Sequence, residues 1–131
     1  MGNSARILVV DDSKVMRGII RKMLAAFPGV SVLEARDGKD AWELLQVETV
    51  DLILSDWNMP RMKGIDLLRQ VRSHADMSEL PFVMVTAEAR EDNHAEADTA
   101  RVSSYLTKPF TSETLRRVLA PFLPLDEATP P

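Results

Sequence analysis

The segment DLILSDWNMP, residues 51–60, carries an apolar run between two carboxylates and then passes into a loop. Its Leu-Ile-Leu centre has the length and composition of a buried strand, and Asp56 stands where that strand ends. The run ILVVDD, residues 7–12, repeats this arrangement and ends in Asp11 and Asp12. The two runs therefore predict strands that both end in carboxylates.

Apolar runs of strand length alternate along the chain with stretches of helical spacing. The expected strands cover residues 7–10, 30–35, 52–54, 82–85 and 104–107. Apolar residues spaced by three and four predict the buried faces of helices between and after them. These positions are Val15, Met16, Ile19, Ile20, Met23, Leu24 and Phe27; Ala41, Trp42, Leu44 and Leu45; Ile65, Leu67, Leu68 and Val71; and Leu115, Val118, Leu119 and Phe122.

Turn and capping residues predict where these helices begin and end. Pro28 and Gly29 are expected to end the first helix, the Asp-Gly pair at residues 37–38 to open the second, and Thr111 or Ser112 to cap the last. Residues 87–102 hold little apolar content beyond alanine and are crowded with acidic side chains. We predict a further helix there with a shallow buried face.

The alternation predicts a fold of the α/β class: a mainly parallel sheet, doubly wound, with helices on both faces in three layers. A chain of 131 residues is long enough for one domain with a proper core. We place that domain at residues 6–122. Residues 1–5 are expected to be a disordered lead-in, and the Pro-rich, acidic residues 123–131 a tail or linker stub.

Composition excludes several classes of function. The formal net charge is −4 and no basic stripe is present, which argues against nucleic-acid binding. No apolar stretch approaches the roughly 20 residues of a membrane-spanning helix, so no membrane insertion is expected. The absence of cysteine excludes disulfides and thiolate metal sites and agrees with a cytoplasmic protein.

The polar residues that end the predicted strands are expected to gather at one edge of the sheet. They are Asp11, Asp12, Asp56, Thr86 and Lys108. Ligands of open α/β sheets bind outside the carboxyl ends of the strands. Carboxylates gathered without counter-charge repel by about 4 kcal/mol per pair at 4 Å and an effective dielectric of 20. Such a cluster therefore indicates a site for a hard cation, for chemistry, or for both.

Four motifs carry a resemblance to a known family. They are VVDDS at residues 9–13, SDWNMP at 55–60, MVTAEA at 84–89 and KPFT at 108–111. In this order and spacing they resemble response-regulator receiver domains, specifically the stand-alone CheY type of chemotaxis, over residues 6 to about 122. The resemblance implies a flavodoxin-like (βα)5 fold with strand order 2-1-3-4-5.

The resemblance implies a role for each carboxylate. Asp56 is similar to the family's phosphoacceptor, a carboxylate nucleophile. Asp11, Asp12 and Asp56, with the backbone carbonyl of Asn58, are similar to the ligands of a divalent metal. Mg²⁺ suits hard oxygen ligands of this kind.

It also implies a switch. Lys108 and the hydroxyl of Thr86 are similar to the groups that contact the phosphoryl oxygens, and Tyr105 to the aromatic residue that changes rotamer with Thr86. The bond between Lys108 and Pro109 is expected to be cis, as in the family.

By this resemblance the chain is a two-component response regulator. It accepts a phosphoryl group from a sensor histidine kinase or a histidine phosphotransfer protein and then changes its binding to a protein target. The target face is formed by the helix predicted within residues 87–102, the strand at 104–107 and the last helix. No enzymatic activity is expected beyond self-catalysed phosphoryl transfer and autodephosphorylation.

Other functions remain open to the sequence. The chain is alternatively a receiver cut from a larger regulator, or a phosphate sink in a relay. A Mg-dependent phosphatase of the haloacid-dehalogenase type is disfavoured, because Asn58 stands where that family has a second Asp. A flavodoxin is disfavoured because no phosphate loop rich in Ser, Thr or Gly follows the first strand.

Single residues also have simpler explanations. Asp11 or Asp12 alone would be an ordinary cap of the first helix. Thr86 would be an ordinary residue at a strand end, and Tyr105 a fixed core aromatic.

The chain departs from the family pattern at a few positions. Arg101 and Ser104 stand near a usual glycine, and Ala95 and Asp98 stand where larger or neutral residues anchor the helix before the switch aromatic. Lys63 lies in a loop that is often acidic. None of these positions belongs to the expected phosphorylation site.

Overall fold

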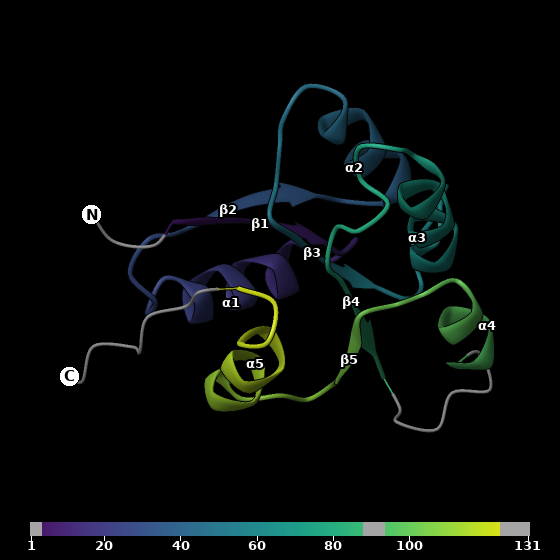
Figure 1. Ribbon diagram of the computed structural model, residues 1–131. Coiled ribbons are helices and arrows are strands. Elements are labelled where there is room, and N and C mark those ends of the chain that lie inside the picture. The colour runs from purple at the N-terminus through teal and green to yellow at the C-terminus, as the bar shows by residue number, and fades with distance from the viewer. Residues whose placement is uncertain (1–3, 88–93, 124–131) are drawn as a thin grey trace.

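The computed structural model describes residues 4–87 and 94–123 and alternates strands with helices throughout (Figure 1). The strands are β1 (Ala5–Val10), β2 (Val30–Ala35), β3 (Leu52–Asp56), β4 (Phe82–Thr86) and β5 (Ser104–Thr107). The helices are α1 (Lys14–Leu24), α2 (Gly38–Leu45), α3 (Gly64–Ser73), α4 (His94–Thr99) and α5 (Ser112–Leu119).

All neighbouring strands pair in parallel, and the sheet order is β2-β1-β3-β4-β5. This confirms the predicted α/β class and strand order. Helices α1 and α5 cover one face of the sheet, and α2, α3 and α4 cover the other (Figure 1). The central strands are buried on both faces, which explains why they read as continuous apolar runs.

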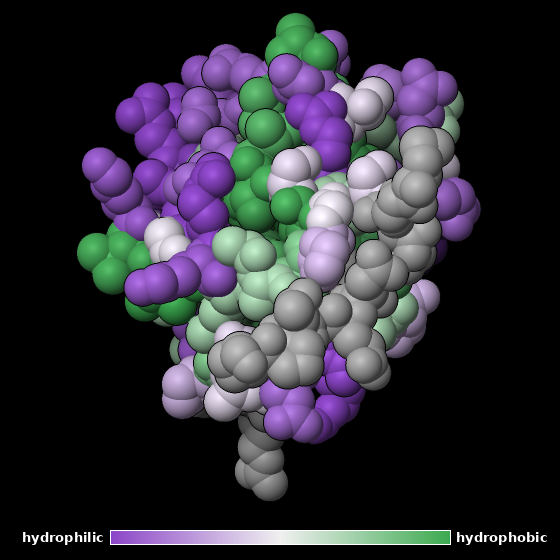
Figure 2. Space-filling view, turned by 90° about the vertical axis from the view of Figure 1, so that its left-hand side faces the viewer, coloured by the Kyte–Doolittle hydropathy of each residue, from purple (hydrophilic) through white to green (hydrophobic). Residues whose placement is uncertain are grey.

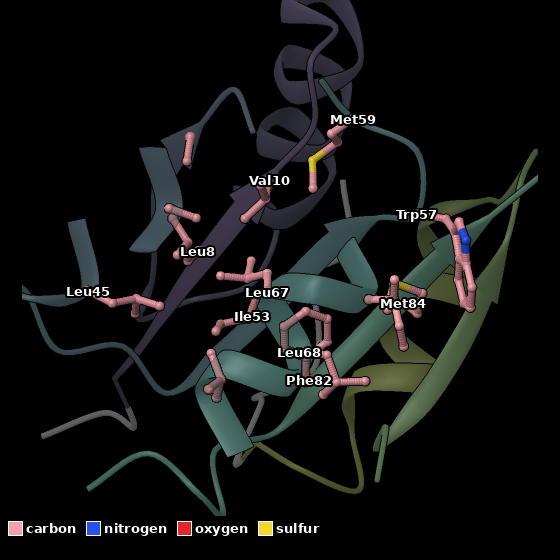
Figure 3. Close-up of a cluster of buried hydrophobic side chains, with 14 of the residues drawn as sticks. Leu8, Val10, Leu45, Ile53, Trp57, Met59, Leu67, Leu68, Phe82 and Met84 are labelled. Carbon is pink, nitrogen blue, oxygen red and sulfur yellow. The ribbon is translucent and has the colours of Figure 1, made fainter. Parts of the chain in front are cut away.

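The two faces of the sheet carry two separate apolar cores. Figure 3 shows the larger one, where side chains of β1, β3 and β4 meet those of α2 and α3. Its labelled members are Leu8, Val10, Leu45, Ile53, Trp57, Met59, Leu67, Leu68, Phe82 and Met84. The opposite core joins the sheet to Ile20 and Leu24 of α1 and to Leu115 and Leu119 of α5. Helices on both faces therefore hold the strand ends in fixed positions.

One face of α1 differs from the prediction. Ile20 and Leu24 are buried as expected, but Val15 is 74% exposed and Ile19 is 42% exposed. Val15 and Ile19 lie four residues apart and form a row beside the buried row, which no element of residues 4–87 and 94–123 covers. The prediction that the whole apolar set is buried was therefore wrong for these two residues.

Side-chain caps begin three of the helices. The oxygens of Ser13, Asp37 and Thr111 each accept a hydrogen bond from a first-turn backbone N–H, of α1, α2 and α5 respectively. These contacts confirm Asp37 and Thr111 as predicted starts. Helix α1 ends earlier than predicted, at Leu24, and its chain continues in turns to the Pro-Gly pair.

Helix α4 ends at Thr99, earlier than the helix predicted at residues 87–102. Residues 88–93 of that prediction lie outside the described part of the chain. The predicted shallow buried face is confirmed at Ala97, which is fully buried against the larger core.

A left-handed residue ends α4. Arg101 has a φ of 66°, its N–H bonds the carbonyl of Asp98, and the N–H of Val102 bonds the carbonyl of Ala97. This is the hydrogen-bond pattern of a Schellman motif, in which the left-handed position usually holds glycine. The absence of glycine therefore leaves the helix end intact but places an arginine in an unfavourable conformation.

The packed fold extends slightly beyond the predicted boundaries of 6 and 122. Ala5 belongs to β1 and is buried, and Leu123 is buried against the α1–α5 core. The remaining predicted lead-in, residues 1–3, and tail, residues 124–131, lie outside the described residues, while Ser4 is exposed.

The outer surface is mixed in character. Figure 2 shows the side that lies on the left of Figure 1, where hydrophobic residues gather in the middle and hydrophilic residues border them. Exposed apolar residues are ordinary on the surfaces of folded proteins. Within residues 4–87 and 94–123, no helix is long and apolar enough to cross a membrane.

Candidate functional site

The polar residues that end the strands do meet at one edge of the sheet. Asp56 and Thr86 are the last residues of β3 and β4, because these strands run two residues and one residue past their expected ends, while Asp11 and Lys108 directly follow β1 and β5. Carboxylate oxygens of Asp11, Asp12 and Asp56 lie within 4.8 Å of one another. The predicted acidic cluster is therefore present.

Lys108 partly balances this cluster. Its Nζ lies 3.3 Å from Asp56 Oδ1 and 3.6 Å from Asp11 Oδ2. Its backbone N–H donates to the carbonyl of Thr86 at 2.8 Å, and the following bond to Pro109 is cis, as predicted. The lysine is thus held beside the end of β4, with its charge directed at two carboxylates.

The surroundings of Asp56 disfavour the charged form of its carboxyl group. Burial raises the pKa of its carboxyl, and the Asp11 carboxylate raises it further. Lys108 and a backbone hydrogen bond from Trp57 oppose these effects without cancelling them. One lysine therefore does not neutralise the cluster, and the site retains an excess of negative charge.

Asp11 is anchored firmly and does not cap α1. It is buried, its Oδ1 accepts the N–H of Ser13 at 2.8 Å, and its carbonyl accepts Arg17 Nη1 at 2.6 Å. Ser13 is the capping residue. The capping explanation for Asp11 or Asp12 is therefore wrong, and exposed Asp12 remains available to a ligand.

The loop after Asp56 folds back tightly onto β3 and β4. The N–H of Trp57 bonds the carbonyl of Val85, and the N–H of Gly64 bonds the carbonyl of Trp57 at 3.0 Å. A Cβ on Gly64 would collide with the carbonyl oxygen of Asp56 and lie 2.9 Å from Met84 Sδ. Only glycine lets α3 begin this close to Asp56.

Asn58 lies in the exposed part of this loop, directly after buried Trp57. Lys63 occupies the N-cap position of α3 without a side-chain cap bond. The lysine that stands in this often acidic loop therefore lies at the start of α3 and does not belong to the carboxylate cluster.

Arg61 and Asp37 form a contact that the sequence pattern did not predict. Arg61 Nε donates to Asp37 Oδ2 at 2.6 Å and Nη2 donates to Oδ1 at 3.1 Å. Burial raises the pKa of Asp37, but hydrogen bonds from Arg61 and from the N–H of Asp40 leave it below its ordinary value. The Asp-Gly pair indicated only a helix start, and no sequence signal marks a partner 24 residues away.

Thr86 and Tyr105 share one face of the sheet. Thr86 is fully buried, Met84 pairs with Tyr105 across the β4–β5 ladder, and residues 84 and 86 point to the same side. Tyr105 packs against the larger core, and its hydroxyl donates to Asp98 Oδ1 of α4 at 2.7 Å. Tyr105 thus lies on the same face of the sheet as Thr86 and is bonded to α4.

The profile of the response regulator receiver domain matches residues 7–120, nearly the whole packed fold. The chain belongs to the response-regulator receiver family. Receiver domains are phosphoacceptor signalling domains that interact with histidine kinases and protein targets, and this chain has that signalling role. This assignment replaces the phosphatase and flavodoxin alternatives.

Chemotaxis proteins are among the curated relatives of the receiver domain. The CheY protein of Pseudomonas aeruginosa is 45% identical over 111 residues, which cover 85% of this chain and 90% of that protein. The CheY-3 protein of Vibrio cholerae is 40% identical over 119 residues, which cover 91% and 92%.

Solved receiver structures have the same fold. The chemotaxis response regulator CheY4 of Vibrio cholerae matches with a TM-score of 0.85 and 33% identity over 92% of this chain and 99% of that one. The receiver domain of the sensor histidine kinase PA1611 of Pseudomonas aeruginosa matches with a TM-score of 0.82 and 28% identity, covering 91% and 97%. That structure is described with a magnesium ion coordinated in the active-site cleft.

Proposed function

We propose that Asp56 is the phosphoacceptor of this receiver domain and takes its phosphoryl group from a histidine kinase or histidine phosphotransfer protein. The observation that supports this most is the position of Lys108 Nζ between Asp56 and Asp11, inside a cluster that keeps excess negative charge. A carboxylate oxygen of Asp56 attacks the phosphorus, and the bond from phosphorus to the donor imidazole nitrogen breaks. The electron pair of that bond returns to the imidazole.

The donor set fits Mg²⁺. Asp11, Asp12 and Asp56 offer hard oxygens within 4.8 Å, and the carbonyl of Asn58 completes the proposed set. When bound, Mg²⁺ offsets the charge of the phosphoryl group. Lys108 then contacts one phosphoryl oxygen through its ammonium group, and the Thr86 hydroxyl donates to another.

The proposed output runs from Thr86 to Tyr105. Phosphorylation draws Thr86 toward the phosphoryl group, and Tyr105 turns inward into the space that Thr86 leaves. Because Tyr105 is bonded to Asp98 of α4, its movement changes the face formed by α4, β5 and α5. A protein target that prefers the changed face stabilises it.

We place the phosphodonor on an apolar groove between α1 and the segment after β5. Met16, Ile19, Met23 and Phe110 line this groove together with Lys108. Since Lys108 also contacts Asp56, a protein seated here lies next to the phosphoacceptor. The exposed position of Ile19 makes it the accessible apolar contact.

Comparing phosphorylation by a protein donor with phosphorylation by a small donor tests the docking groove separately from the phosphoacceptor site. Ile19→Glu should slow transfer from a phosphorylated histidine phosphotransfer domain and leave transfer from acetyl phosphate unchanged. Val47, 79% exposed and absent from the groove lining, supplies the control Val47→Glu, which should change neither rate. Equal slowing by both donors would show damage to the site and contradict the groove as a docking surface.

Mass spectrometry tests the phosphoacceptor directly. Wild-type protein treated with acetyl phosphate and Mg²⁺ should gain one acid-labile phosphoryl group, and Asp56→Asn should gain none. A labile phosphate on Asp56→Asn would refute the assignment.

The finer role in the cell is part of the same proposal. We infer a cytoplasmic chemotaxis switch without enzymatic activity beyond its own phosphorylation and dephosphorylation, which acts on a protein and not on nucleic acid. A phosphate sink and a receiver within a larger regulator are the alternatives. Hydrogen exchange with a phosphoryl mimic distinguishes the sink, because only a switch changes protection in α4 and β5 as well as around Asp56.

A further inference from the structure

The loop after Asp56 is tied to the start of α2 by an unusual pair of side chains. The guanidinium of Arg61 donates hydrogen bonds to both carboxylate oxygens of Asp37, at 2.6 and 3.1 Å. Asp37 is 2% exposed and also accepts the N–H of Asp40 with Oδ1 at 2.8 Å. The carboxylate therefore has a fixed position, and the arginine that binds it is held in place with it.

The backbone at Arg61 is equally constrained. Arg61 has a φ of 65°, in the left-handed region, and the N–H of Met62 reaches back to the carbonyl of Pro60 at 2.7 Å. A residue other than glycine adopts such a tight turn only where its surroundings impose it. The two-pronged bond to Asp37 is one contact that holds Arg61 in this turn.

A backbone contact beside this pair reinforces the tie. The N–H of Gly38 donates to the carbonyl of Met62 at 3.0 Å, and a Cβ at Gly38 would lie 2.6 Å from that carbonyl oxygen. The loop and the first turn of α2 are therefore in direct contact. The ion pair and this bond fix the far end of the segment that begins at Trp57.

We propose that Arg61 is a positioning residue, which holds the loop carbonyl of Asn58 in place through Asp37 and thereby sets the affinity of the acidic cluster for Mg²⁺. This inference rests on the proposed metal site. Mg²⁺ demands near-ideal octahedral geometry, so a carbonyl ligand from a loose loop binds it poorly. The segment from Trp57 to Gly64 is closed at its base by the bond between those residues, and Arg61 is its second anchor.

Magnesium titration by calorimetry tests the proposal on the full chain. Arg61→Ala should weaken Mg²⁺ binding by about tenfold, the lower end of the effect of removing a group that orients a ligand. The Mg²⁺ affinity of Arg61→Lys should lie between those of wild type and Arg61→Ala. The lysine ammonium is a point charge and cannot bind both Asp37 oxygens in the same forked geometry. Arg61→Gly should also weaken binding, because it relieves the backbone but removes the side-chain anchor.

A neighbouring arginine supplies the matched control. Arg36 lies beside Asp37 in the chain but contacts Asp40 at 3.9 Å, and its side chain is 68% exposed. Arg36→Ala removes the same charge from the same region and should leave Mg²⁺ affinity unchanged. An equal loss in this control would show that general electrostatics sets the affinity, and would overturn the positioning role.

Amide hydrogen exchange in metal-free protein supplies a second readout. Arg61→Ala should speed exchange at Met62 and Gly64, whose N–H groups are bonded within the loop, and leave the strands unchanged. If wild type binds Mg²⁺ and Arg61→Ala binds it equally well, the positioning role is overturned while the metal site stands. If wild type binds no Mg²⁺, the proposed metal site fails and the inference fails with it.

Discussion

The hydroxyl of Tyr105 in β5 donates a hydrogen bond to Asp98 Oδ1 in α4 at 2.7 Å. The same aromatic ring packs against the core that α4 shares with the sheet. Tyr105 therefore holds α4 to β5 with both its polar and its apolar parts. Any inward rotation of Tyr105 must break this bond.

The titration of Tyr105 should reveal the bond. Burial, then the hydrogen bond and the charge of Asp98, raise the Tyr105 pKa above its ordinary value of 10.0. Tyr105 is the chain's single tyrosine, so phenolate absorbance reports it alone. Asp98→Asn should lower the pKa of Tyr105. The stability that the raised pKa of Tyr105 gives to the folded state is fully present below pH 10. It is lost as the pH rises above 10, because Tyr105 then loses its proton in the unfolded chain before it does so in the folded protein.

Loss of the same bond should make the switch easier. Asp98→Ala removes a contact that exists only while Tyr105 points outward, so a phosphoryl mimic should shift the tyrosine environment at lower concentration than in wild type. Arg117→Ala, which breaks an exposed ion pair on α5, is a control that should leave the response unchanged. An unaltered response in Asp98→Ala would mean that the bond does not restrain the switch.

Asp56→Asn should stabilise the metal-free protein. The substitution removes a carboxylate whose pKa burial and Asp11 have raised. We expect Tm in EDTA at pH 7 to rise by about 4 °C, the shift that about 1 kcal/mol causes in a chain of this size. The gain should shrink as the pH falls through the raised pKa of folded Asp56 toward 3.8, because the wild-type carboxylate is then protonated. A lower Tm at pH 7 would show that the ion pair with Lys108 outweighs the repulsion.

Lys108→Ala should separate phosphorylation from response. The variant keeps the carboxylates, so acetyl phosphate with Mg²⁺ should still modify Asp56, though more slowly. It lacks the ammonium that lies 3.3 Å from Asp56 Oδ1, and the change in α4 and β5 should be largely lost. Parallel mass spectrometry and hydrogen exchange measure the two effects. A full exchange response in the phosphorylated variant would contradict the role of Lys108 in reading the phosphoryl group.

Arg101→Gly should stabilise the end of α4. Arg101 has a φ of 66°, which costs an L-residue more than glycine, and we expect a gain of about 0.5–1 kcal/mol in chemical denaturation. The backbone carbonyl that accepts Arg72 Nε is retained in this variant. Arg61→Gly is the contrasting case, because its φ of 65° is similar but its side chain binds Asp37 at 2.6 Å, whereas the Arg101 side chain makes only a long, exposed bond of 3.5 Å to the carbonyl of Arg72. Arg61→Gly should therefore lower the folding stability. If Arg61→Gly and Arg101→Gly both raised it, the ion pair between Arg61 and Asp37 would contribute little.

Much of the fold was predictable from local pattern. Strands β2 and β5 have the predicted bounds, and the others extend the predicted runs by one or two residues. Asp37 and Thr111 begin helices as their residue types indicate. Burial on both faces of a parallel sheet and helix capping each leave a signal within a few neighbouring residues, so these features can be read along the chain.

The acidic cluster was predictable for the same reason. Asp11 and Asp56 each stand at the end of an apolar run, and parallel strands bring their carboxyl ends to one edge whatever the details of packing. The contact between Lys108 and both carboxylates follows from that topology.

Other features depended on the tertiary structure. The pairing of Arg61 with Asp37 joins residues that are 24 positions apart, and the outward face of Val15 and Ile19 on α1 depends on which surface α5 and the sheet leave uncovered. By itself the sequence determined the alternation of strands and helices and the meeting of the carboxylates, because these follow from periodicity and chain direction. Only the tertiary structure decided which apolar residues stay exposed and which side chains anchor the loop after Asp56, because both depend on contacts between segments that are distant in the sequence.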